Sequence, residues 1–365
     1  MKTAAYFLVY LILIQIFLPY LAPGQLIYDQ RLDYDLVKDR PTNMEAVLEQ
    51  VKLTIERENL REYAVILGDS LAYSNPGPAS ESISALMNEK WRSEGVGYPV
   101  FNLAMPAMQA GDFYVMLLDM EKHGISSDRL ILNVTYAGFI GRDPEPPAVY
   151  WLTEQLKELD GAAYEKIEPA LPDYAKVAPV KITDWGAVKR RLGTLLYEHV
   201  NLFKYKDLWQ SYLSLRYGQW RNQAAAAPAP TEPWFTKDFL PELLQRPEYQ
   251  RDFSAAPFIM DDSNPQCYFL NRIMELQRGK DTIIFLSGIN PVLMEKNLSA
   301  PGYRENLARI DAFFEDKGVI YFNAYNMIDD KLYSDHIHLT KDGYAFLTGI
   351  LLEQTAQWRE GRGDR

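Results

Sequence analysis

Two short segments of the chain carry residue types that can together activate a serine. Gly68-Asp69-Ser70 directly follows the apolar run Tyr63–Leu67. A serine at this point lies at the carboxyl end of a buried strand, and the preceding glycine permits the tight turn that exposes its hydroxyl. A serine hydroxyl is a poor nucleophile until a base takes its proton. The segment therefore predicts nucleophilic chemistry only where a base is within reach.

The C-terminal segment Ser334–Thr340 supplies a candidate base and a partner for it. The chain has four histidines, and two of them, His336 and His338, lie in this segment. Asp335 precedes His338 by three residues, about one turn, so its carboxylate can reach the ring nitrogen that faces away from the serine. That contact would fix the tautomer and stabilise the imidazolium formed when His338 takes the serine proton. The alternative interpretation is that Asp335 and His336 cap a turn and that His338 is a surface histidine.

Other kinds of chemistry find less support in the sequence. Asp335, His336 and His338 could bind a divalent metal, but no further ligand is identifiable, so we predict no metal and no cofactor. One cysteine, Cys267, excludes an internal disulfide framework and a cysteine-based zinc cluster. The net charge of −11 argues against a general nucleic-acid binder.

Apolar runs and helical patterns alternate along the chain and predict the elements that position these residues. This alternation is typical of βαβ units, whose parallel sheet is covered by helices on both faces. Sites in such sheets form at the carboxyl ends of the strands. The predicted strands are Tyr63–Leu67, Tyr98–Leu103, Leu130–Val134, Thr282–Ser287 and Val319–Asn323. The predicted helices are Met44–Leu60, Glu81–Trp91, Asp112–His123, Tyr303–Phe314 and Lys341–Trp358.

The interval between the third and fourth predicted strands is far longer than an ordinary connection. It opens with the Pro-rich stretch Asp143–Pro147 and contains the low-complexity stretch Ala224–Pro233, which is typical of a flexible loop or linker. Between them, Trp185–Trp220 is rich in Leu, Tyr and Trp, with Lys and Arg interleaved. One interpretation is a pair of amphipathic helices packed on the sheet domain. The other is a surface that meets lipid headgroups or a membrane partner.

The N-terminal segment Ala4–Ala22 carries no charge and is long enough to cross a bilayer core of about 30 Å. Lys2 gives it a positive flank, and Tyr6 and Tyr20 lie near its two ends, where interfacial aromatic rings are favoured. A cleaved signal peptide is the alternative, although the residues after Tyr20 make a poor cleavage site. In both cases the residues from about 25 onward lie outside the cytoplasm.

Taken together, Gly68-Asp69-Ser70 after the first strand and Asp335-x-x-His338-Leu339 before the last helix resemble the GDSL/SGNH hydrolase family. The resemblance implies the SGNH fold, a flavodoxin-like three-layer α/β/α sandwich with a five-stranded parallel sheet. It also implies Ser70 as nucleophile, His338 as general base and Asp335 as its orienting partner in acyl transfer through an acyl-enzyme.

The family's oxyanion-hole motifs are only partly present. Where the family has a glycine after the second strand, the chain has Ala104, whose backbone N–H can still donate. The family's Gly-x-Asn after the third strand is absent, and Asn133 is the nearest candidate. The predicted oxyanion donors are therefore Ser70, Ala104 and Asn133. With these departures and its N-terminal segment, the chain resembles the membrane-anchored DltD-like and polysaccharide O-acetylation branch. Many members of that branch work with a membrane-bound O-acyltransferase.

We therefore predict a membrane-anchored, extracytoplasmic serine esterase or O-acyltransferase that acts on acyl esters, such as acetyl esters, of a cell-envelope polymer or glycan. The alternative is a non-catalytic assembly partner of a membrane-bound O-acyltransferase. The predicted domains are an anchor or signal over 1–24, a juxtamembrane segment and helix over 25–60, and an SGNH-like domain over 61–365 with a large, mostly helical insertion at about 141–264.

Overall fold

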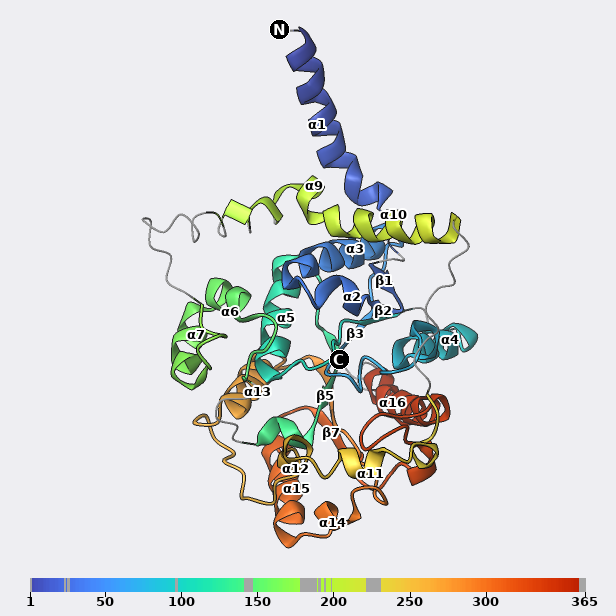
Figure 1. The fold of residues 1–365 in the computed structure, drawn as a ribbon, viewed down its shortest axis with the longest axis vertical. Coiled ribbons are helices and arrows are strands. Elements are labelled where there is room, and N and C mark those ends of the chain that lie inside the picture. The colour runs from blue at the N-terminus through green and yellow to red at the C-terminus, as the bar shows by residue number, and fades with distance from the viewer. Residues whose placement is uncertain are drawn as a thin grey trace. The chain divides into compact units, whose positions relative to one another are not determined.

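A computed structural model gives the fold of the chain (Figure 1). It describes residues 2–22, 24, 27–95, 98–140, 147–177, 189, 192–193, 195–197, 199–220 and 231–360. The chain divides into two compact units. Unit 1 comprises Met1–Leu60 and Val177–Ala227, and unit 2 comprises Arg61–Lys176 and Pro228–Arg365.

The structure divides the chain after residue 60 and again within the insertion. The sequence places the whole insertion in the domain 61–365, whereas the structure groups residues 177–227 with the N-terminal residues. Contacts between residues far apart in the sequence, such as Gln15 with Asn201, join this part of the insertion to the N-terminal helices, and hydrophobic periodicity does not predict such contacts. The predicted Pro-rich stretch is described only at Pro147, and residues 224–230 of the low-complexity stretch lie outside the described residues.

Five parallel strands form the centre of unit 2 and confirm the predicted flavodoxin-like α/β fold. Their spatial order is β4-β3-β5-β6-β7, so the first strand of the unit lies inside the sheet and the second lies beside it. Because all five run parallel, their carboxyl ends meet at one edge. The strands are β3 Ala64–Leu67, β4 Val100–Asn102, β5 Arg129–Val134, β6 Asp281–Leu286 and β7 Ile320–Asn323.

Helices cover both faces of this sheet. Figure 1 shows α4 and α16 on one side of the strands and α5 and α13 on the other. The helices that connect and follow the strands are α4 Ile83–Ser93, α5 Ala110–Lys122, α13 Pro265–Leu276, α15 Pro301–Phe314 and α16 Lys341–Glu360. The remaining helices of unit 2 are short: α6 Thr153–Leu159, α7 Gly161–Ile167, α11 Leu240–Leu243, α12 Pro247–Arg251 and α14 Glu295–Leu298.

The sequence explains where these elements form. All four residues of β3 and all six of β5 are buried, as expected of apolar strands covered on both faces. Capping side chains mark the starts of two helices. The Ser82 hydroxyl accepts the N–H of Ala85 at the start of α4, and the Asn264 side chain accepts the N–H of Gln266 at the start of α13, whose first residue is Pro265.

Unit 1 is built from helices and one two-stranded ribbon. Its elements are α1 Lys2–Leu21, β1 Tyr28–Asp29, β2 Arg31–Leu32, α2 Tyr34–Val37, α3 Met44–Arg57, α9 Asn201–Lys204 and α10 Lys206–Trp220. The strands β1 and β2 pair antiparallel. Among the described residues, no helix combines the length and the apolar character required of a membrane span.

Candidate active site

Ser70 lies where β3 ends, and the sequence before it determines how the chain turns there. A Cβ atom on Gly68 would lie 2.6 Å from the Cβ atoms of both Ala72 and Asn133, so this close approach requires glycine. The Asp69 carboxylate accepts the N–H of Leu71 at 2.9 Å and closes a tight turn around the serine. The turn leaves Ser70 part-buried at the carboxyl edge of the sheet.

His338 joins Ser70 and Asp335 into a hydrogen-bonded triad, as the sequence predicted. His338 Nε2 lies 2.8 Å from Ser70 Oγ, across 268 residues of sequence. His338 Nδ1 lies 2.7 Å from Asp335 Oδ2. Each imidazole nitrogen thus has one partner, which is the arrangement needed to take a proton from a serine and stabilise the resulting imidazolium.

The loop around Asp335 holds the carboxylate in place. Asp335 Oδ1 accepts the backbone N–H groups of Ile337 at 2.8 Å and His338 at 2.7 Å, which leaves Oδ2 for the imidazole. The backbone N–H of Ser334 donates to the carbonyl of His338 at 2.8 Å and closes the loop. Three residues of separation therefore suffice to orient the imidazole by contacts inside one loop.

Two residues from outside this loop also support it. The N–H of Asn290, which follows β6, donates to the carbonyl of His336 at 2.9 Å. Lys237 Nζ donates to the carbonyl of Ser334 at 2.8 Å and to its hydroxyl at 3.0 Å. Sequence reasoning missed Lys237, because an isolated lysine in a long insertion carries no local signal of this contact.

The charges of the triad favour an ionised aspartate and a basic histidine. Burial alone would raise the pKa of Asp335, but the charge and hydrogen bond of His338 outweigh it and hold that pKa well below its usual range. Burial alone would lower the pKa of His338, but Asp335 outweighs it and raises the pKa above 6.5. Burial raises the pKa of the nearby Asp69 carboxyl.

His336 has the opposite electrostatic character to His338. Its ring packs against Tyr249 and Phe253, with ring centroids 5.6 Å and 5.8 Å apart. Burial lowers the pKa of His336 to about 4, and the nearby Asp335 only partly opposes this effect. His336 is therefore neutral at pH 7 and serves the packing of the loop, while His338 contacts Ser70.

Two of the three predicted oxyanion donors make hydrogen bonds within the protein. The backbone N–H of Ala104 donates to Asn102 Oδ1 at 3.0 Å, and Ala104 is fully buried. Asn133 is also fully buried, and its Nδ2 donates to Ser287 Oγ at 2.8 Å. Both bonds have one physical reason: a buried polar group is usually satisfied by a neighbouring polar atom.

Ala107, three residues after Ala104, has an unusual backbone conformation. Its φ of 65° is the left-handed conformation that glycine favours. The N–H groups of Ala107 and Ser70 have no acceptor in the part of the chain that the structure describes. The free N–H makes Ala107 a candidate oxyanion donor, which local sequence patterns do not reveal because an alanine at positive φ looks like any other alanine.

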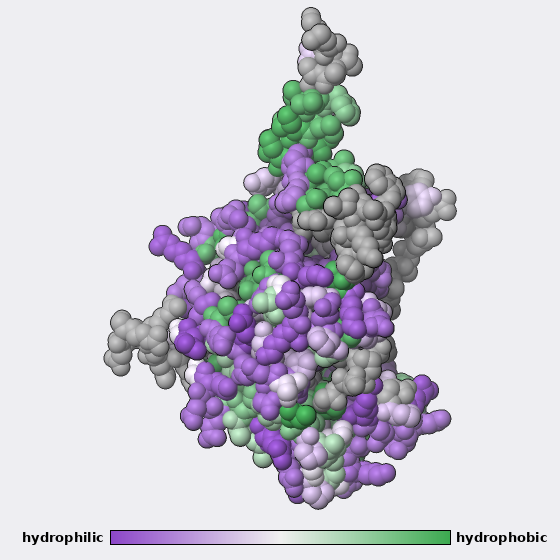
Figure 2. Space-filling view, turned by 90° about the vertical axis from the view of Figure 1, so that its left-hand side faces the viewer, coloured by the Kyte–Doolittle hydropathy of each residue, from purple (hydrophilic) through white to green (hydrophobic). Residues whose placement is uncertain are grey.

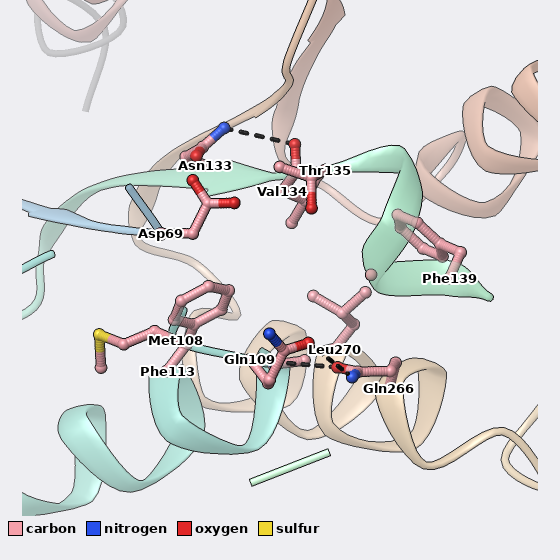
Figure 3. Close-up of a pocket in the computed structure, with 12 residues that line it drawn as sticks. Asp69, Met108, Gln109, Phe113, Asn133, Val134, Thr135, Phe139, Gln266 and Leu270 are labelled. Carbon is pink, nitrogen blue, oxygen red and sulfur yellow. Dashed lines mark hydrogen bonds between the residues drawn. The ribbon is translucent and has the colours of Figure 1, made fainter. Parts of the chain in front are cut away.

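A small cavity lies beside the nucleophile turn, between the ends of β3 and β5 and the starts of α5 and α13 (Figure 3). Asp69, Asn133 and Thr135 line one side, and Gln109 and Gln266 line the other. Its volume of about 20 Å³ has room for roughly one water-sized group. Asn133 Oδ1 is buried there without a hydrogen-bond partner among the described residues.

Comparison with known proteins gives no assignment for the chain. No family model matches it, and no curated protein matches its sequence. In the described part of the chain, no group of three or more His, Cys, Asp and Glu side chains is placed to hold a metal ion.

Proposed function

We propose that the chain is an extracytoplasmic serine esterase or O-acyltransferase of the GDSL/SGNH type. The observation that carries the proposal is the placement of His338 between Ser70 Oγ at 2.8 Å and Asp335 Oδ2 at 2.7 Å. Packing alone gives no reason for a serine, an imidazole and a carboxylate to line up at the carboxyl edge of a parallel sheet. Such an alignment is the geometry of nucleophilic acyl transfer.

The reaction would proceed through an acyl-enzyme. Ser70 Oγ attacks the carbonyl carbon of the ester while His338 Nε2 takes the serine proton. The tetrahedral intermediate collapses, the C–O bond to the alcohol breaks, and His338 returns its proton to the departing oxygen. Water or a sugar hydroxyl then attacks the acyl-Ser70 ester, with His338 again as base, and releases an acid or a new ester.

The proposed substrate is a cell-envelope polymer or glycan that carries short acyl groups such as acetyl. The size of the acyl group comes from the resemblance to the polysaccharide O-acetylation branch. The charge-free segment Ala4–Ala22 supports a location at the membrane, with the active site outside the cytoplasm. Which acceptor the enzyme uses depends on whether water or a sugar hydroxyl reaches the acyl-enzyme faster.

A fluorophosphonate probe tests the nucleophile directly. The full-length protein in detergent is treated with the probe, and the adduct is mapped by mass spectrometry. We expect labelling at Ser70, no labelling of Ser70→Ala, and strongly reduced labelling of His338→Ala. Labelling elsewhere, or an active and folded Ser70→Ala protein, would contradict the triad assignment. An acetyl aryl ester with and without an added glycan then separates hydrolysis from transfer, because transfer yields an acetylated glycan.

A non-catalytic role as an assembly partner of a membrane-bound O-acyltransferase is the second candidate. The observation that favours it is the oxyanion side of the site, where the Ala104 N–H and the Asn133 amide are both committed to other acceptors. A folded protein that reacts with no fluorophosphonate, yet co-purifies with the acyltransferase of its membrane, would favour this role.

A further inference from the structure

A proline inside α1 creates an attachment point for the insertion. Pro19 has no N–H, so the carbonyl of Gln15, four residues earlier, loses the donor that a helix normally supplies. Asn201, the first residue of α9, donates to this carbonyl from Nδ2 at 2.6 Å. The backbone N–H of Asn201 donates to Gln15 Oε1 at 2.8 Å, and Gln15 Nε2 donates to the carbonyl of His199 at 2.8 Å. The insertion is thus joined to α1 at one defined level, that of Gln15.

A buried polar network holds the other face of the same helices. Gln50 Nε2 on α3 donates to the carbonyl of Pro19 at 2.8 Å and to Tyr205 Oη at 3.0 Å. Tyr205 Oη donates to Glu49 Oε2 at 2.9 Å, and Lys204 Nζ lies 3.2 Å from the same oxygen. Lys204 and Tyr205 are buried, so this face of α9 and α10 is occupied by α3.

The opposite face of α9 and α10 is exposed and carries large apolar side chains. Leu202 is 49% exposed, Leu213 is 61% exposed and Tyr217 is 53% exposed. Lys206 lies among them on the same side of the helix. In Figure 1, α10 runs across the direction of α1, with α3 on its other side. Figure 2 shows the hydrophobic surface along α1 itself.

The charge of this segment complements an anionic surface. Residues 185–220 contain six Lys and Arg and two Asp and Glu, in a chain whose net charge is −11; one of the six, Lys204, is buried beside Glu49 and leaves five for such a surface. Basic residues near exposed Leu and Tyr side chains are the composition of helices that lie in the plane of a membrane interface. Basic residues close to an anionic membrane surface are attracted to it.

The level of the attachment matches the depth at which such helices lie. Gln15 is six residues before Leu21, or about 9 Å along the axis at about 1.5 Å per residue. Interfacial helices are buried about 5–10 Å into the headgroup and acyl boundary. At that depth water no longer satisfies a free carbonyl, so the carbonyl of Gln15 needs the internal donor that Asn201 provides.

We propose that α9 and α10 form a membrane seat: they lie in the extracytoplasmic interface of an anionic bilayer, with Leu202, Leu213 and Tyr217 in the lipid and Asn201 joined to α1. The inference rests on the proposed insertion of α1 and not on the chemistry of Ser70. The occupant of the exposed face is the lipid bilayer, and a protein partner there is an outcome that the experiment can reveal.

Depth-dependent fluorescence quenching tests the seat on the full-length chain. In a Cys267→Ala background, single cysteines at Leu8→Cys, Leu202→Cys, Leu213→Cys and Glu56→Cys are labelled with an environment-sensitive dye. The proteins are reconstituted in vesicles of phosphatidylcholine and phosphatidylglycerol that contain doxyl lipids. We expect quenching at position 8, blue-shifted and quenched emission at positions 202 and 213, and unquenched emission at Glu56, an exposed site on α3.

The outcomes separate the seat from the anchor. Quenching at position 8 without quenching at 202 and 213 overturns the seat and leaves the anchor intact. No quenching at position 8 overturns both. Dyes at 202 and 213 that are unquenched in lipid but shielded when the membrane acyltransferase is added overturn the seat in favour of a protein interface.

The link between Pro19 and Asn201 has a test of its own. Asn201→Leu is expected to reduce quenching at 202 and 213 and to leave position 8 unchanged. In a Pro19→Ala background the helix supplies its own donor to Gln15, so Asn201→Leu should add little further loss. An equal loss in both backgrounds would overturn the pairing of the Gln15 carbonyl with Asn201.

Discussion

The loop that carries His338 and the strand ends that face it differ in how their polar groups are satisfied. In the loop, Asp335 bonds to the next residues along the chain and still has one oxygen for the imidazole. At the ends of β4 and β5, the Ala104 N–H and the Asn133 amide bond to Asn102 and Ser287. The base is thus oriented before any substrate arrives, whereas two of the three groups expected to stabilise the oxyanion are hydrogen-bonded within the protein.

This difference separates two parts of catalysis that often occur together. Activation of the serine needs one oriented imidazole and one carboxylate, and contacts within a short loop supply both. Stabilisation of the oxyanion needs N–H donors without an acceptor of their own, and buried strand ends rarely leave such groups free. The following four predictions, in order of decreasing expected effect, test how far this contrast holds.

Asp335→Asn should have the largest effect among substitutions that preserve the loop. Asn Oδ1 can still accept the N–H groups of Ile337 and His338, but the side chain no longer stabilises an imidazolium. We expect kcat to fall about ten-thousandfold, as is typical of this change in serine triads. His336→Asn is the control in the same loop and should change kcat less than tenfold. If His336→Asn lowered kcat as much as Asp335→Asn does, the loss would come from altered loop geometry and not from the charge of Asp335.

Substitution of Ala107 should lower kcat, whereas substitution of Asn133 should hardly change it. Ala107→Val puts a β-branched residue at a φ of 65° and should shift the backbone N–H, so we expect kcat to fall by about 10- to 100-fold. Ala107→Gly should keep the activity. Asn133→Ala should change kcat less than threefold, or about 0.7 kcal/mol. A loss of about 100- to 1,000-fold for Asn133→Ala would restore Asn133 as an oxyanion donor.

The pH dependence of the rate should report the raised pKa of His338. Only the neutral imidazole can accept the serine proton, so kcat/KM should fall about tenfold per pH unit below that pKa, which lies above 6.5. Asp335→Asn should move the residual profile to lower pH, because the charge that raises the pKa is gone. A wild-type inflection well below pH 6 would show that burial outweighs Asp335.

His336 should affect the pH dependence of stability and not of the rate. Its folded-state pKa of about 4 is below its unfolded value of 6.5, so its contribution is full above pH 6.5 and is lost as the pH falls toward 4. The loss is at most about 3 kcal/mol in the free energy of unfolding. His336→Asn should flatten the dependence of Tm on pH across this window, and an unchanged slope would assign it to other groups.

Local patterns in the sequence determined the centre of the site. The spacing of Asp335 and His338 predicted their contact, because a turn of three residues brings these side chains together whatever surrounds it. The alternation of apolar strands with helices predicted that Ser70 and the C-terminal loop would meet at one edge of a parallel sheet. Periodicity and short-range hydrogen bonds depend on residues that are close in the sequence, so they can be recognised without knowledge of the fold.

Only the tertiary structure decided the oxyanion side and the grouping of the insertion. Whether the Ala104 N–H or the Asn133 amide is free depends on which acceptors the packed strands bring beside it. The attachment of Asn201 to the carbonyl of Gln15 likewise joins residues 186 apart. Buried polar atoms take the nearest available partner, and that partner is set by long-range packing, which no local pattern encodes.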